Sequence, residues 1–403
     1  MTQLEQSNAA VIEQIDQSSM LAQVQAWGAI NTGTGNLAGL AQQAGLLANA
    51  FSFLPGEVEM VDAAPVTAVN AAGEEFEKPH GQHLVLRVRP GASLRLLFTG
   101  HMDTVFPVDH PFQNQQWLDD QTLNGPGLAD MKGGIAVMLH ALLAIETQEN
   151  AARIGYDVLI NADEETGSLS SRGLIEHLAA GKYAALTYEP SALPDGTLAH
   201  SRGGTGNYSA IVKGKSAHAG RNPQDGRNAI VAAAALAVGL KGLETPECSV
   251  NPAKIEGGAA NNVVPDNAVL RFNIRPKEPA AGQMFEAGLQ ALMGDIRQAH
   301  EVSIDLHGGV TRPPKPVDRQ AQKLFDLVRD CGAMLGQEIN WQSTGGVCDG
   351  NNIAACGVPV VDTMGVRGGA IHSPQEFMIV PSLKERAALS ALVLSRLASG
   401  DEL

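Results

Sequence analysis

Two histidines and a group of acidic residues in this chain are of the types that hold and use paired divalent cations. They lie in five separated stretches: His101 with Asp103, Asp130, Glu164 with Glu165, Glu189, and His372. Imidazole nitrogens and carboxylate oxygens are the donors of hydrolytic zinc centres, and a further glutamate can act as the base for water. The set therefore indicates a two-metal centre, and the reaction it favours is amide hydrolysis.

The His101-Met102-Asp103 stretch combines a metal donor with a carboxylate two residues away. On extended backbone these two side chains point to the same side. This arrangement suits His101 as a ligand and Asp103 as the carboxylate that holds the ring in its metal-binding tautomer. On its own, the pattern also fits a strand-end turn with an incidental histidine, so its meaning depends on the other motifs.

Asp130 lies between Gly125-Pro126-Gly127 and Lys132-Gly133-Gly134. The glycines permit tight turns that present a carboxylate at a loop apex, where its two oxygens could bridge two ions. A phosphate-binding loop is the rival interpretation. It requires G-x-x-x-x-G-K-[ST] directly after a strand, and this segment has neither feature.

Glu164 and Glu165 are adjacent, and adjacent residues outside a helix project in different directions. One carboxylate can therefore face a metal while its neighbour faces the attacking water. The spacing does not say which does which, and a solvated acidic loop has the same composition. Glu189 before a proline and His372 in a glycine-rich loop are individually weak signals that gain meaning only from the complete set.

Short apolar runs typical of strands alternate with helical stretches through most of the chain. The β-type runs are 94–98, 157–160, 183–187 and 358–361, and the helical stretches are 134–146, 171–179 and 383–397. This alternation predicts an α/β fold with a mixed, mainly parallel sheet flanked by helices on both faces. His101, Glu164 and Glu189 follow the carboxyl ends of such strands, which is the edge where open α/β sheets place their sites.

Residues 198–311 have a different character, with a β-α-β-β-α-β order of predicted elements. We expect this segment to be an inserted lid and dimerisation domain. Residues 1–197 and 312–403 would then form the two parts of a catalytic domain.

The charge balance excludes some functions. With 28 basic and 43 acidic residues the net charge is −15, which disfavours binding to nucleic acid or to an anionic membrane. Residues Met1 to Ser19 lack the features of a secretory signal, and no apolar run reaches the roughly 20 residues of a membrane helix. The four cysteines form no C-x-x-C pair and are expected to be free thiols. These features favour a cytoplasmic enzyme.

In their order and spacing, these motifs resemble those of the co-catalytic zinc peptidases and deacylases. That family includes glutamate carboxypeptidase of the carboxypeptidase G type, acetylornithine deacetylase, succinyl-diaminopimelate desuccinylase and aminoacylase. The resemblance extends from about residue 20 to the end of the chain. It implies a zinc exopeptidase-like catalytic domain with two Zn²⁺ per subunit, for which Co²⁺ or Mn²⁺ are alternatives.

The resemblance also implies a role for each candidate. Its ligand set is His101 and Glu189 on one zinc, Glu165 and His372 on the other, and Asp130 bridging both. Asp103 would orient His101, and Glu164 would be the general acid and base. The family pattern further implies a cis peptide bond between Asp130 and Met131.

The inserted segment contains Lys215-Ser216-Ala217-His218-Ala219-Gly220, which is similar to the family's lid motif. In that motif the histidine, here His218, reaches across a homodimer into the partner's site and polarises the scissile carbonyl. Asn262 and Arg275 match positions that bind the substrate's carboxylate, although a solvated strand arginine is an equal alternative for Arg275. Gly345 and Gly346 are expected to supply backbone amides to the same group.

The expected substrate is a small N-acyl amino acid or short peptide with a free carboxylate, cleaved as by a glutamate carboxypeptidase. A deacylase like acetylornithine deacetylase or succinyl-diaminopimelate desuccinylase is the alternative, and a non-catalytic metal-binding relative is the alternative of another class. The stretch 346–352 departs from the Gly-Gly-Gly-Thr-Asp pattern of the carboxypeptidase branch and places Cys348 near the substrate. No neighbour that could activate Cys348 is identifiable, which argues against a nucleophilic cysteine.

Overall fold

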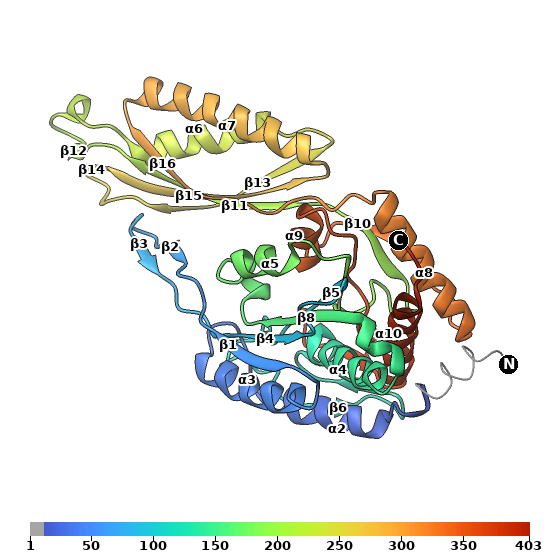
Figure 1. Ribbon diagram of the computed structural model, residues 1–403. Coiled ribbons are helices and arrows are strands. Elements are labelled where there is room, and N and C mark those ends of the chain that lie inside the picture. The colour runs from blue at the N-terminus through green and yellow to red at the C-terminus, as the bar shows by residue number, and fades with distance from the viewer. Residues whose placement is uncertain (1–11) are drawn as a thin grey trace.

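A six-stranded mixed sheet forms the centre of the larger of two units in the computed structural model, which describes residues 12–403 (Figure 1). In spatial order its strands are β1 (Glu57–Val61), β4 (His83–Val88), β8 (Ile154–Asn161), β5 (Leu94–His101), β9 (Ala184–Thr187) and β18 (Val360–Val361). β8, β5, β9 and β18 run parallel, whereas β4 is antiparallel to both of its neighbours. The predicted mixed, mainly parallel sheet is confirmed. The expected absence of a signal in Met1 to Ser19 depends partly on residues 1–11, which lie outside the described residues.

Helices cover both faces of this sheet, as predicted. One face carries α2 (Gln17–Gly28), α3 (Leu37–Phe51), α4 (Gly133–Glu146) and α10 (Ser382–Ser399), and the other carries α5 (Arg172–Ala179) and α9 (Asp349–Ala355). The alternation of side chains along β5 explains the two layers. Leu96 and Phe98 pack in the first hydrophobic core, and Leu97 between them packs in the second.

The segment Leu128–Glu146, which includes α4, is long and apolar enough to cross a membrane by length and composition. However, 89% of its apolar window is buried inside the protein. Its contacts with α10 and α2 make it a core helix of the larger unit.

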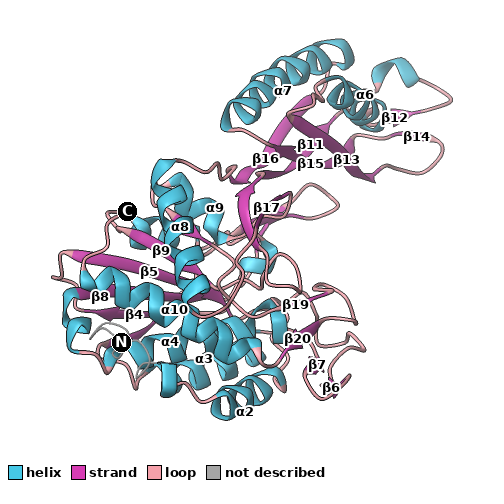
Figure 2. Ribbon diagram, turned by 90° about the vertical axis from the view of Figure 1, so that its right-hand side faces the viewer, coloured by secondary structure: helices cyan, strands magenta, loops and turns pink. Residues whose placement is uncertain are grey.

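The smaller unit is a four-stranded antiparallel sheet with α6 (Ala229–Gly242) and α7 (Pro279–His300) on one face (Figure 2). Its strands, in spatial order, are β13 (Cys248–Gly257), β15 (Asn267–Pro276), β11 (Thr205–Lys213) and β16 (Ser303–Arg312). Chain order gives the β-α-β-β-α-β sequence expected from the periodicity. Tyr208 and Phe272 stack 4.9 Å apart on the helix side, so Asn207, Ser209 and Asn273 belong to the open face.

A β-hairpin that the sequence analysis did not predict extends from the larger unit to this open face (Figure 1). We call it the arm; it comprises β2 (Thr67–Val69) and β3 (Glu75–Glu77). The arm's turn needs glycine at Gly73, because φ is +74° there and a Cβ would lie only 2.7 Å from Ile211. Strands of three residues are too short to show a period, which explains why the sequence gave no signal.

Candidate active site

The candidate donors meet at the carboxyl edge of the central sheet. β5 ends at His101, and Glu189 lies two residues beyond the end of the neighbouring parallel strand β9. Glu164 and Glu165 form a short helical turn after β8, on the other side of β5. His372 comes from the loop between β19 (Gly368–Gly369) and β20 (Phe377–Ile379) and has the left-handed backbone conformation, with φ of 62°. A non-glycine residue in this conformation costs roughly 1–3 kcal/mol, so the fold must hold the loop in place.

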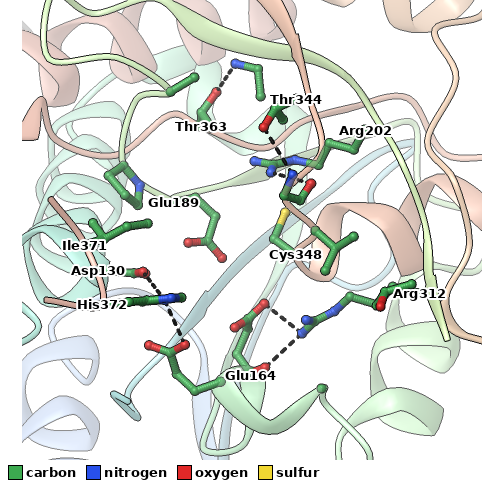
Figure 3. Close-up of a pocket in the computed structure, with 18 of the residues that line it drawn as sticks. Asp130, Glu164, Glu189, Arg202, Arg312, Thr344, Cys348, Thr363, Ile371 and His372 are labelled. Atoms are coloured by element: carbon green, nitrogen blue, oxygen red, sulfur yellow. Dashed lines mark hydrogen bonds and ion pairs between the residues drawn. The ribbon is translucent and has the colours of Figure 1, made fainter. Parts of the chain in front are cut away.

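Asp130 occupies the middle of this group, and each of its oxygens faces a different histidine. Figure 3 shows its contact with His372. Oδ1 lies 3.1 Å from Nε2 of His101, and Oδ2 lies 3.3 Å from Nε2 of His372. Glu189 completes the first set with Oε2 at 3.8 Å from His101, and Glu165 completes the second with Oε2 at 3.2 Å from His372. Two ligands that each lie about 2.1 Å from a tetrahedral ion are roughly 3.4 Å apart, so each histidine–carboxylate pair has about the spacing of two donors to one metal. Donor atoms of His101, Asp130 and Glu165 also lie within 4.8 Å of one another, so the two sets adjoin.

Asp103 holds both the first histidine and the glutamate pair. Nδ1 of His101 lies 3.0 Å from the backbone carbonyl of Asp103 and 3.4 Å from its carboxylate. The carboxylate also accepts the backbone N–H groups of Glu164 and Glu165, at 3.1 and 3.2 Å, and the Thr34 hydroxyl at 2.7 Å. This buried aspartate therefore fixes the ring and the turn together, whereas the spacing predicted only the contact with the ring.

Glu376 is a buried carboxylate that the sequence analysis missed. Its Oε1 accepts the backbone N–H groups of Ala129 and Asp130 at 3.0 and 3.2 Å. These bonds hold the turn that presents Asp130, whose peptide bond to Met131 is cis, as the resemblance implied. Glu376 belongs to no recognisable motif and lies 246 residues from Asp130, so the sequence carried no signal for this contact.

The electrostatics of the group favour a divalent cation. Burial raises the pKa of Glu165 and of Glu189, and the negative charge of Asp130 raises both further. The pKa of His372 is raised to about 11 by its hydrogen bonds with Asp130 and Glu165. Buried carboxylates in excess over imidazoles need a compensating positive charge. The donor types, their spacing and this charge imbalance therefore fit divalent metal ions.

Arg312 is the second residue that the sequence analysis missed. It ends β16 of the smaller unit, and its Nη2 donates to Glu164 at both the carboxylate (2.7 Å) and the backbone carbonyl (3.0 Å) (Figure 3). The same nitrogen contacts Ser168 at 2.9 Å and lies 3.4 Å from Asp349, with the guanidinium almost completely buried. Burial raises the pKa of Glu164, and the charge of Arg312 opposes that rise.

Glu164 also has an oxygen within 4.8 Å of the donors of His101 and Glu189. Its proximity to them therefore does not by itself decide whether Glu164 is a metal ligand or a base.

A cavity of about 630 Å³ opens over the donors. Arg275, Gly346 and Cys348 line it together with Arg202, whereas Gly345 is not among the lining residues. Cys348 is 2% exposed, and burial raises the pKa of its thiol well above the ordinary value. The predicted placement of Cys348 beside the pocket is observed, and the raised pKa agrees with the argument against a nucleophile.

His218 and Asn262 lie together but away from this cavity. β12 (Ala217–His218) pairs with β14 (Val263–Val264), and the N–H of Ala219 donates to the Asn262 carbonyl at 2.9 Å. Both side chains are exposed at the far end of the smaller unit (Figure 1). Within one chain, the structure therefore does not bring these two residues to the metal donors.

Residues 97–396 match the sequence profile of peptidase family M20/M25/M40, and this range includes every candidate donor described above. The chain belongs to this family. It is therefore a hydrolase. The fold predicted from the resemblance is confirmed, because it is the fold of M20 peptidases.

Curated M20 relatives cover most of the chain. Carboxypeptidase G2 of Pseudomonas sp. (strain RS-16) is 29% identical over 384 residues, which is 92% of this chain and 87% of the relative. A succinyl-diaminopimelate desuccinylase of Xanthomonas oryzae pv. oryzae is 28% identical over 356 residues, which is 83% of this chain and 92% of the relative. Similarity to both a carboxypeptidase and a desuccinylase leaves the substrate unassigned.

Solved structures of M20 relatives share the fold. A tripeptidase from Staphylococcus aureus superposes with a TM-score of 0.73 at 23% identity, covering 96% of this chain and 100% of its own. An M20 metallo-carboxypeptidase from Sulfolobus solfataricus gives 0.71 at 16% identity, with coverage of 96% and 100%. At these identities the likeness concerns the fold alone.

Proposed function

We propose that this M20 hydrolase cleaves the amide bond of an N-acylated or peptide-linked amino acid with a free carboxylate, in the manner of a glutamate carboxypeptidase. The observation that supports this most is Asp130, whose two oxygens face two separate donor sets. We assign two Zn²⁺ per subunit, and Co²⁺ or Mn²⁺ suit the same mixed nitrogen and oxygen donors.

The proposed ligand set is His101 and Glu189 on one ion, Glu165 and His372 on the other, and Asp130 on both. When bound, such ions supply Lewis acidity toward the amide carbonyl and lower the pKa of water. Glu164 would accept a proton from the attacking water at its carboxylate and deliver it to the departing amine nitrogen. Asp103 would hold the His101 ring, and Arg312 would hold the Glu164 carboxylate in place.

The proposed carboxylate-binding residues are Asn262, Arg275, Gly345 and Gly346. Arg275 supports this best, because it lines the active-site cavity and its guanidinium has no carboxylate partner among residues 12–403. A planar guanidinium can bind a substrate carboxylate through two parallel hydrogen bonds. Glutamate is the first candidate for the released amino acid, because carboxypeptidase G2 is among the relatives. A deacylase is the second candidate activity, because desuccinylases are also among the relatives.

A substrate panel tests the proposed function. The protein, loaded with zinc, cobalt or manganese, is assayed against N-acetyl, N-succinyl and N-aminoacyl amino acids. Preferential release of glutamate from a peptide or acyl linkage is the expected result. Preference for an N-acetyl or N-succinyl diamino acid would support the deacylase alternative. A protein that retains metal but hydrolyses no member of the panel would be a non-catalytic relative.

We further propose that residues 198–311 form a lid and dimerisation domain that works in a homodimer. α6 exposes Val231 and Val238, which are 51% and 76% accessible, on a helix with no charged residue before Lys241. β13 is an edge strand that pairs only with β15 in the described part of the chain. An apolar helix face beside an open strand edge suits a second copy of the chain. That copy would bring His218 to the partner's site.

Mixing two inactive variants tests the contribution of His218 from the partner. His218→Ala chains and Glu164→Gln chains, refolded together, should recover roughly a quarter of the parent activity. This fraction is expected because half of the pairs are mixed and each mixed pair contains one intact site. Adding Val238→Asp to both chains should prevent the recovery by separating the subunits. No recovery in verified mixed dimers would show that His218 acts in its own chain, and a His218→Ala variant that is fully active by itself would show that His218 does not act at all.

Arg312→Ala is expected to lower kcat about 10- to 100-fold, because the buried Glu164 carboxylate loses its charged partner and its fixed position. KM should change much less, and Arg312→Lys should restore part of kcat. Steady-state kinetics with a metal assay and circular dichroism measure these effects. A change confined to KM would instead assign Arg312 to substrate binding.

A further inference from the structure

A second cavity of about 620 Å³ lies beside the active-site cavity, under the open face of the smaller unit's sheet. Thr166, Asn207 and Thr311 line both cavities. Since Thr166 directly follows Glu165, the second cavity begins next to the metal donors. Its volume is within the roughly 300–1,000 Å³ of ordinary ligand sites.

Part of the wall of this second cavity is apolar. Val69 contributes from the arm, together with Pro65 and Val66, which precede it. Leu169 contributes from the loop after the glutamate pair and is 42% exposed, although it is a large apolar side chain. An exposed leucine in the wall of this cavity offers a contact surface to an apolar ligand group.

Hydrogen bonds between the arm and the sheet fix the shape of this cavity. Nη2 of Arg271 donates to the carbonyls of Val69 (2.7 Å) and Asn70 (3.3 Å). Val69 also packs against Ile211 and Val269 of the sheet. The cavity is therefore already formed without a ligand, so less ordering is needed when one binds.

The two cavities offer different side chains to a substrate. In the second cavity Arg271 is neutralised by Glu256 at 2.9 Å and also bonds Ser209 at 2.9 Å. In the first cavity the side chain of Arg275 bonds only the neutral Asn273 among the described residues, at 2.9 Å. Arg275 therefore favours an anionic group in the first cavity. The second cavity offers the apolar side chains of Pro65, Val66, Val69 and Leu169, although Lys78 and His307 also line it.

We propose that the second cavity is the subsite for an extended apolar acyl group of the substrate, on the side of the scissile amide opposite to the carboxylate. This inference rests on the proposed function, because it places the amide at the metal donors between the two cavities. It predicts that the protein distinguishes substrates by the length of the acyl chain.

Calorimetric binding of N-acyl-glutamates to the zinc-loaded Glu164→Gln variant tests the subsite without requiring turnover. The acyl chain is lengthened from acetyl to decanoyl at concentrations below micelle formation. Each buried methylene should tighten Kd about two- to fourfold until the cavity is filled. In this background, Leu169→Asp should reduce the gain in affinity from acetyl to the longest chain at least tenfold. Ala68→Trp, which fills the arm's side of the cavity, should also remove this gain.

Leu46→Asp is the matched control, because Leu46 is 40% exposed on α3 and does not line either cavity. It should leave the gain unchanged. A Kd that is the same for every chain length, absence of binding throughout the series, or a full gain in both cavity variants would overturn the subsite. The parent enzyme's turnover is measured separately. A length-dependent Kd without any hydrolysis would refute the proposed function and leave the subsite standing.

Discussion

Glu164→Gln is expected to lower kcat by roughly a hundredfold to ten-thousandfold, the range typical of a lost general acid and base. Glutamine keeps the shape of the side chain and can still contact Arg312, but it cannot accept the proton of water. Because Glu164 also lies within 4.8 Å of possible metal donors, the metal content of the variant decides between two roles. If Glu164 is a base, the Glu164→Gln variant keeps both ions bound. If Glu164 is a metal ligand, the variant does not.

Glu176→Gln is the control for this substitution. Glu176 lies on α5, and its contact with Arg172 is an exposed i,i+4 pair, so its loss should leave kcat unchanged. Steady-state kinetics and elemental analysis on the same preparations give both readouts. A Glu164→Gln enzyme with full kcat would remove Glu164 from the proposed chemistry.

Asp130→Ala is expected to abolish binding of both ions and to reduce activity by more than a thousandfold. One side chain affects two ions because each of its oxygens faces a different donor set. Glu189→Ala, in contrast, should weaken mainly the ion at His101, because Glu189 contacts only that set. Metal content after dialysis against a weak chelator, followed by kinetics, distinguishes these two patterns.

Asp120→Ala serves as the control, because Asp120 lies in the exposed turn before β7 (Thr122–Asn124) and away from the donors. It should retain two ions and parent activity. If Asp130→Ala and Glu189→Ala each lost a single ion, Asp130 would not bridge.

The central sheet was predictable because its strands are apolar runs separated by helical periods. The run 94–98 identified β5, although the strand continues to His101 and so ends on a candidate metal donor. β4 was not predicted, despite five of its six residues being buried. The arm escaped detection because it is held by contacts of Arg271 and Ile211, about 140 to 200 residues away, rather than by a local pattern.

The clustering of the candidate donor residues was predictable because their chemical types are rare in combination and follow strand ends. The residues that hold them were not. Arg312 and Glu376 appear in the sequence as an ordinary strand arginine and an ordinary loop glutamate. Their partners Glu164 and Asp130 lie 148 and 246 residues away, and only the packing of the two units and of the β20 loop brings them together.

Anomalous diffraction from crystals grown with zinc, recorded on both sides of the absorption edge, tests the proposed metal centre most directly. We expect two zinc peaks per chain, one between His101 and Glu189 and the other between His372 and Glu165, with Asp130 bound to both. A single peak, or two peaks that do not share Asp130, would contradict the paired-metal account.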